Sequence, residues 1–101
     1  MEFDLSCRYD ARQSFYGKAR VKEERKKDYC KLSLISYSTT VATIEYFYKD
    51  LYVEKAIYQY FGKYSQTTTR HQKEFFKQNN LSDKEIKQLF KDGSLTITYI
   101  V

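Results

Sequence analysis

Apolar and polar residues alternate with a period of two along much of the first half of the chain. Between Phe15 and Glu23 the apolar or small residues share one side and the polar residues share the other, which is typical of a half-buried β-strand. The polar side forms a row that begins with an aromatic residue and continues with cations: Tyr16, Lys18, Arg20 and Lys22. The charged run over residues 23–28 contains no apolar residue and predicts a hairpin loop.

Three further strands are predicted before Gly62. Residues 29–37 alternate, and residues 40–48 are rich in the β-branched and aromatic side chains that favour strands. Lys49 and Asp50 then form a two-residue link, which favours an antiparallel hairpin and therefore a strand over residues 51–60. The apolar positions of residues 51–60 also fit a helical period, so a helix stays the alternative for this segment.

Helical spacing replaces alternation after Gly62. Ser65 is a suitable N-cap for a helix that continues to about Asn79. Ser82 and Glu85 have the spacing of a capping box, which predicts a second helix through Lys91. Alternation returns over residues 95–101 and predicts a last strand. The expected fold class is therefore α+β: an antiparallel sheet of about five strands, in the element order ββββααβ, with two helices packed on one face.

Length and composition narrow the possible functions. The 101 residues predict a single domain over residues 1–101. A net charge of +5, from 18 Lys and Arg against 13 Asp and Glu, favours an anionic partner such as nucleic acid or an acidic protein surface. The chain has no apolar run of membrane length and no signal-peptide pattern, so we expect a cytoplasmic protein with no membrane partner. Two distant cysteines and one histidine predict neither a zinc site nor any other metal site, and we expect no cofactor.

His71, the only histidine, is the natural candidate for acid–base chemistry, but we expect it to be structural. His71 and Glu74 lie three positions apart and share a side of the first helix, as a pair of metal ligands can, yet no third ligand follows at a recognisable spacing. We therefore expect no catalytic residues and no enzymatic activity. A ribonuclease that uses His71 with a nearby Glu or Tyr as acid and base stays open as an alternative.

Two basic sets form the candidate binding site for nucleic acid or for a protein that holds it. Cationic and aromatic side chains on a solvent-facing strand can contact phosphates and stack a base. The first set is the row described above with its charged extension: Tyr16, Lys18, Arg20, Lys22, Arg25, Lys26 and Lys27. The second set lies on the first predicted helix: Arg70, Lys73 and Lys77. Simpler interpretations are an edge strand protected by lysines for the first set and a solvated helix face for the second.

Three blocks of the sequence resemble a family of small proteins carried by phages and mobile elements of Gram-positive bacteria. The blocks read YDARQSFYGKA over residues 9–19, SYSTTVA over residues 36–42 and YSQTTTRHQKEF over residues 64–75. They fit the pattern YDxRxSFYGKA, SYxTxVA and YSxTTxRHxxEF. Some proteins that look like this are anti-CRISPR proteins that act on type II-A effector nucleases. The segment after Asn80 and the tyrosine-rich residues 46–60 depart from the common pattern.

The resemblance implies an anti-CRISPR inhibitor of a type II-A CRISPR RNA-guided effector nuclease, acting in the cytoplasm of the bacterial host. The implied partners are the effector nuclease, its guide RNA, or both. A basic protein fits interference with guide RNA loading or nucleic-acid binding better than DNA mimicry, since such effectors hold nucleic acid in a positively charged channel. The alternatives are a nucleic-acid-binding phage regulator and an inhibitor that cleaves the guide RNA.

Overall fold

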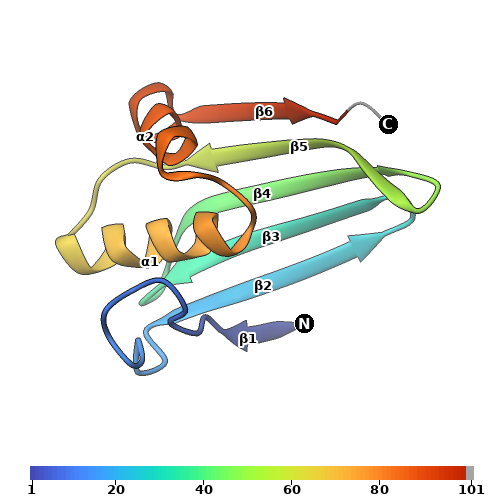
Figure 1. Cartoon of the computed structure of the whole chain (residues 1–101). Coiled ribbons are helices and arrows are strands. Elements are labelled where there is room, and N and C mark those ends of the chain that lie inside the picture. The colour runs from blue at the N-terminus through green and yellow to red at the C-terminus, as the bar shows by residue number, and fades with distance from the viewer. Residues whose placement is uncertain (100–101) are drawn as a thin grey trace.

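The computed structural model describes residues 1–99, so the last two residues of the predicted final strand lie outside the described residues. Six antiparallel strands form one sheet in chain order, and two helices lie between the fifth and sixth strands in the chain (Figure 1). The strands are β1 (Glu2–Asp4), β2 (Ala19–Lys26), β3 (Tyr29–Ser36), β4 (Thr39–Lys49), β5 (Tyr52–Tyr60) and β6 (Ser94–Thr98). The helices are α1 (Gln66–Gln78) and α2 (Asp83–Asp92).

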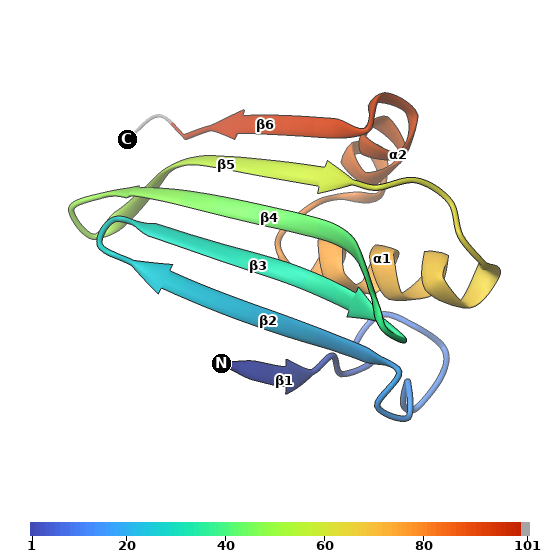
Figure 2. The ribbon, with the colours of Figure 1, turned by 180° about the vertical axis from the view of Figure 1, so that it is seen from behind.

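Both helices lie on the same face of the sheet, and the other face is open (Figure 2). This arrangement confirms the α+β class and the antiparallel sheet. Residues 51–60 are a strand, so the helical alternative for that segment is wrong. The sheet has one strand more than expected, because Phe3 pairs with Val21 and thereby places β1 beside β2. None of the helices within residues 1–99 is both long enough and apolar enough to cross a membrane.

The core lies between the helix-side face of the sheet and α1. Ile44 and Tyr58 are neighbours across β4 and β5, and both are fully buried. They lie in one apolar cluster with Phe75 and Phe76 of α1, and the Tyr58 ring meets Phe76 edge to face with 6.4 Å between ring centroids. Burial of such side chains stabilises the fold by about 2 kcal/mol each, so this cluster holds α1 on the sheet.

Both helix starts follow the predicted capping. Ser65 accepts a hydrogen bond from the backbone N–H of Thr68 at 3.1 Å, and Ser82 with Glu85 forms the complete capping box. At the other end of α2, Gly93 has a φ of 85°, the left-handed conformation that commonly ends a helix. The chain can then turn directly into β6.

The predicted strand from Phe15 is wrong at its beginning, because β2 starts only at Ala19. Tyr16 and Gly17 have φ values of 54° and 73°, which no strand residue adopts. The N–H of Lys18 donates to the carbonyl of Phe15 at 2.9 Å and closes a tight turn. The alternation of side chains therefore continues across a turn, and Tyr16 and Lys18 do not belong to the same strand row as the cations that follow.

The predicted loop over residues 23–28 is also wrong, because β2 continues through Lys26 and only residues 27–28 form the turn. This end of the sheet extends past both helices (Figure 1). A strand that no helix covers needs no apolar side, so a purely charged sequence is compatible with it. The charged run predicted a loop because apolar periodicity is the main signal for a strand.

Candidate nucleic-acid interface

The structure divides the first basic set into three places. Arg20 and Lys22 lie on the open face of the sheet, where Arg20 pairs with Glu2 at 3.0 Å and Lys22 pairs with Glu24 at 3.6 Å. Because each cation has an acidic neighbour, the open face of β2 is not a positive surface. Since β1 pairs with β2 at both positions, these residues do not protect a free edge.

The charged extension of this set lies at the end of the sheet away from α1. Arg25 pairs with Glu23 at 3.2 Å, and Lys26, the last residue of β2, and Lys27, in the β2–β3 turn, are both exposed. That turn and α1 lie at opposite ends of β2 (Figure 1). Residues 25–27 therefore cannot act together with the cations of α1 on one small ligand.

The remaining members, Tyr16 and Lys18, lie close to the second basic set. Three adjoining hollows follow the exposed side of α1. The first is lined by Tyr16 and Tyr37 and has a volume of about 160 Å³, and the third lies beside α2 and has a volume of about 450 Å³. The first and second share Arg12 and Thr67 in their walls, and the second and third share Lys73. We call these hollows together the α1 groove. Its cationic wall residues are Arg12, Lys18, Arg70, Lys73, Lys77 and Lys87.

The α1 groove is positive after ion pairs are taken into account. Arg70 pairs with Asp10 at 3.2 Å, and Lys77 pairs with Asp83 at 2.9 Å. Within residues 1–99, the other four cations of the groove form no ion pair, and all four are exposed. Unpaired guanidinium and ammonium groups are strong donors to phosphate oxygens, so the groove has the chemistry of a phosphate-binding surface.

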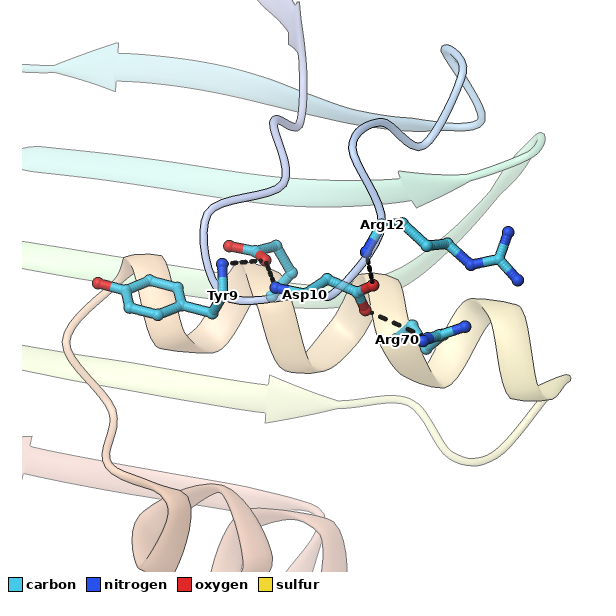
Figure 3. A network of polar contacts seen from close by, with 5 residues as sticks. Tyr9, Asp10, Arg12 and Arg70 are labelled. Atoms are coloured by element: carbon cyan, nitrogen blue, oxygen red, sulfur yellow. Dashed lines mark hydrogen bonds and ion pairs between the residues drawn. The ribbon is translucent and has the colours of Figure 1, made fainter.

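The buried carboxylate of Glu74 holds the loop that carries Arg12 against α1. Its Oε1 accepts hydrogen bonds from the backbone N–H groups of Tyr9 at 2.8 Å and Asp10 at 2.9 Å (Figure 3). Its Oε2 accepts from Nε2 of Gln78 at 2.6 Å. A carboxylate buried to this extent is tolerated only with such donors. The Glu74 side chain therefore fixes the position of residues 9 and 10 on the helix.

Asp10 extends this network to the two arginines of the groove. Its Oδ1 accepts from the backbone N–H of Arg12 at 2.9 Å, and its Oδ2 accepts from Nε of Arg70 at 3.2 Å. Both guanidinium groups extend toward the beginning of α1 (Figure 3). Because Asp10 uses only Nε of Arg70, the terminal guanidinium nitrogens of both arginines stay available. Paired guanidinium groups suit a phosphate oxygen fork better than lysines do.

His71 lies under the first hollow of the groove and is 1% exposed. Its Nδ1 is 2.8 Å from Oγ of Ser36, and that hydroxyl is 2.9 Å from Oγ1 of Thr68. The imidazole also meets the ring of Phe15 edge to face with 4.6 Å between centroids. Burial lowers the pKa of His71 below its ordinary value, so the ring is neutral at pH 7. His71 thus connects β3, α1 and the turn before β2.

The pairing of His71 and Glu74 as metal ligands finds no support in this geometry, because each side chain is already committed to protein partners. Across residues 1–99, no group of three or more His, Cys, Asp and Glu side chains is arranged to hold a metal ion. Cys7 and Cys30 are free thiols, and burial raises the pKa of both.

Two cations and one exposed tyrosine of the groove were missed by the sequence-based candidate set: Arg12, Lys87 and Tyr37. The sequence does contain a signal for Arg12 and Tyr37, because they lie inside the blocks at residues 9–19 and 36–42. Those blocks and the block at residues 64–75 meet at the groove through the hydrogen bonds between Asp10 and Arg70 and between Ser36 and His71. Lys87 belongs to no block, and only the packing of α2 beside α1 brings it to the groove.

Comparison with known proteins yields one match. The family described as a family of unknown function (DUF8033) matches residues 3–93, which include strands β2 to β5, both helices and every residue of the groove. No curated protein and no solved structure matches the chain.

Proposed function

We propose that this chain, which belongs to the DUF8033 family, is a non-enzymatic protein that binds nucleic-acid phosphates in the α1 groove. We further propose that it acts as an anti-CRISPR protein, which inhibits a type II-A CRISPR RNA-guided effector nuclease by interfering with guide RNA loading. Phosphate binding is supported by the row of cations along α1, which has few acidic neighbours. The anti-CRISPR proposal rests on the three sequence blocks, which meet at the same groove.

The position of the charges favours a phosphate backbone over a single small anion. The groove extends along α1 from the β3–β4 turn to α2, because Tyr37 lines its first hollow and Lys87 its third. Successive phosphates of a nucleic acid present negative charge at regular intervals along such a path. A single phosphate or carboxylate would use only one of the three hollows.

Competition for the guide RNA gives such a surface a direct route to inhibition. Effectors of this class hold guide RNA through contacts to its backbone in a positively charged channel. A small protein that covers the same phosphates prevents those contacts from forming. The inhibitor then acts on the free guide or on the effector before loading, and it has less effect on a loaded complex, in which the phosphates are already covered.

The alternative of an inhibitor that cleaves guide RNA needs a free acid and a free base in the groove. Nδ1 of His71 lies within hydrogen-bond distance of Ser36, and both carboxylate oxygens of Glu74 accept hydrogen bonds. General acid–base catalysis requires groups that can reach the proton they transfer. Their existing partners therefore support the binding function over catalysis. A nucleic-acid-binding phage regulator would use the same groove with a different nucleic acid.

An order-of-addition experiment tests the proposal. The protein is added to a type II-A effector either before or after its guide RNA, and cleavage of target DNA and the length of the guide are followed together. We expect at least tenfold stronger inhibition when the protein is added first, with the guide intact. Equal inhibition in both orders contradicts interference with loading. Shortened guide RNA supports the cleaving alternative, and no inhibition with retained RNA binding supports the regulator.

A further inference from the structure

Two tyrosines at the first hollow of the α1 groove have an unusual backbone conformation. Within residues 1–99, five residues other than glycine have positive φ values, and three of them are Asp or Asn, which tolerate this conformation. The other two are Tyr16, with a φ of 54°, and Tyr37, with a φ of 59°. A bulky aromatic residue is rare in this region, and such strain is concentrated at functional sites.

Both tyrosines occupy turn positions at which other residues are favoured. Tyr16 and Gly17 are the central residues of the turn closed by the Lys18 N–H and the Phe15 carbonyl, and both have positive φ. Such turns favour Asn, Asp or Gly at the first central position. Tyr37 begins the two-residue link between β3 and β4, which also favours a small or amide residue at positive φ.

The two turns are joined and present both rings at one hollow. The backbone N–H of Tyr37 donates to the carbonyl of Lys18 at 2.7 Å, which ties the β3–β4 turn to the start of β2. Tyr16 is 76% exposed and Tyr37 is 52% exposed, and both line the hollow above His71. Neither ring is needed to fill the core. Their exposure and their unfavourable turn positions together indicate a role in binding.

We propose that this hollow binds one unpaired base of single-stranded nucleic acid between the rings of Tyr16 and Tyr37, an inference that rests on the proposed function. The hollow has a volume of about 160 Å³, which suits a single flat ring system. Sites for drug-sized ligands are larger, with volumes of about 300 to 1,000 Å³. Arg12 and Lys18 line the same hollow and supply cations for the phosphates on either side of the base. Stacking on aromatic rings beside a positive path is the usual way in which proteins bind single strands.

The neutral ring of His71 forms part of the floor of this hollow. Its Nδ1 is occupied by Ser36, and its ring centroid lies 6.0 Å from that of Tyr37. A neutral, fixed imidazole adds no charge at the place where a base would lie. The cations are instead confined to the wall, so the hollow separates a surface for the base from a surface for the phosphates.

The test compares stability and binding in turn variants of the full chain. Tyr16→Asn and Tyr37→Asn place a favoured residue at each turn, so both variants should keep or raise the melting temperature. Both should weaken binding of a labelled single-stranded oligouridine about tenfold, as measured by fluorescence anisotropy, while binding of a duplex RNA of equal length stays the same. Tyr16→Phe and Tyr37→Phe keep the rings and should bind as the wild type does. The same measurement is made with single-stranded DNA. The proposed pocket makes no contact with a 2′-hydroxyl group, so single-stranded DNA and RNA should bind with similar affinity.

Tyr52→Asn is the matched control, since Tyr52 is also exposed but lies at the other end of the sheet, beside the β4–β5 turn. It should change neither affinity. Unchanged single-strand affinity in both turn variants, or an equal loss in the Tyr52 variant, overturns the base pocket and leaves the groove as a phosphate surface. An equal loss for single-stranded and duplex RNA also overturns it. If the wild type binds no nucleic acid at all, the proposed function fails together with the pocket.

Discussion

The hydroxyl oxygen of Ser36 lies 2.8 Å from Nδ1 of His71, although 35 positions separate the two residues in the chain. Both side chains are almost completely buried, and Phe15 packs against the imidazole from the turn before β2. One contact therefore joins β3 to α1 directly beneath the first hollow of the groove. The shape of the groove depends on this contact, because Phe15 of one turn and Tyr37 of the other both lie against the His71 ring.

Stability should fall in mild acid because of His71. Burial lowers its folded-state pKa below the ordinary value of 6.5, and the smaller effect of the Asp10 carboxylate opposes this. The unfolded chain therefore takes up a proton more readily, so the free energy of unfolding decreases as the pH falls from about 7.5 through 6.5. Urea unfolding between pH 7.5 and 5.5 measures this slope.

His71→Gln should flatten the slope in that pH range, since an amide does not titrate. The variant should also be less stable than the wild type by about 2 kcal/mol at pH 7.5, because it leaves the buried Ser36 hydroxyl and the Phe15 ring with a poorer partner. A wild-type slope that persists in the variant would assign the acid sensitivity to another group.

Glu74→Gln should destabilise the loop that carries Arg12. The amide replaces one of two oxygens that together accept three hydrogen bonds, so a buried donor loses its acceptor at a cost of about 1 to 3 kcal/mol. Hydrogen exchange at the Tyr9 and Asp10 amides should become faster. Glu24→Gln, on an exposed residue of β2, is the control and should change stability by less than about 0.5 kcal/mol. Unchanged exchange in Glu74→Gln would show that the carboxylate does not hold the loop.

Tyr29 should ionise late because its hydroxyl donates to Oε2 of Glu45 at 2.6 Å on the open face of the sheet. This hydrogen bond, with burial as a smaller cause, raises the pKa of Tyr29 from 10 to about 12. The unfolded chain loses the proton first, so this contribution to stability is lost as the pH rises from about 10 to 12. Ring-carbon chemical shifts should show that Glu45→Gln lowers the pKa of Tyr29.

Tyr46 is the internal control for that titration. Burial is the main cause that raises its pKa to about 12, and its hydroxyl donates to Oδ1 of Asn79 rather than to Glu45. Glu45→Gln should therefore leave Tyr46 unchanged. Equal shifts of both tyrosines would indicate that the substitution alters the sheet as a whole.

Most elements of the fold follow from local patterns in the sequence. Strands β3, β4 and β5 alternate or carry β-branched and aromatic residues, and both helices start at serines with the correct partners. Two of the errors lie where a local pattern and its tertiary surroundings disagree. The alternation at residues 15–21 continues across a turn with positive φ, and the charged run at residues 23–26 is a strand because no helix covers it.

The candidate site was predictable only in part for a similar reason. Periodicity identifies Arg70, Lys73 and Lys77 as one face of a helix, but it says nothing of what lies beside that face. Arg12 reaches the helix through the buried Glu74 and through Asp10, whose contacts span 64 and 60 positions in the chain. Acidic neighbours likewise neutralise Arg20 and Lys22: Glu2 reaches Arg20 through the pairing of β1 with β2, and Glu24 lies two positions after Lys22 in the same strand.

The central claim is that the α1 groove, and not positive charge in general, binds RNA. Two double variants separate these explanations, because each lowers the net charge of +5 by four units. Arg12→Glu with Lys73→Glu changes two exposed cations of the groove that form no ion pair with residues 1–99. Lys26→Glu with Lys27→Glu changes two exposed cations at the far end of β2.

The decisive measurement is the affinity of both double variants for guide RNA over a range of salt concentrations. The groove variant should bind at least tenfold more weakly at about 0.1 M salt. The slope of log affinity against log salt should become shallower by about 1.4, because each lost phosphate contact removes about 0.7 from it. The far-end variant should stay within about threefold of the wild type. Equal losses in the two variants, with equal changes in salt dependence, would contradict the claim that the groove is the binding site.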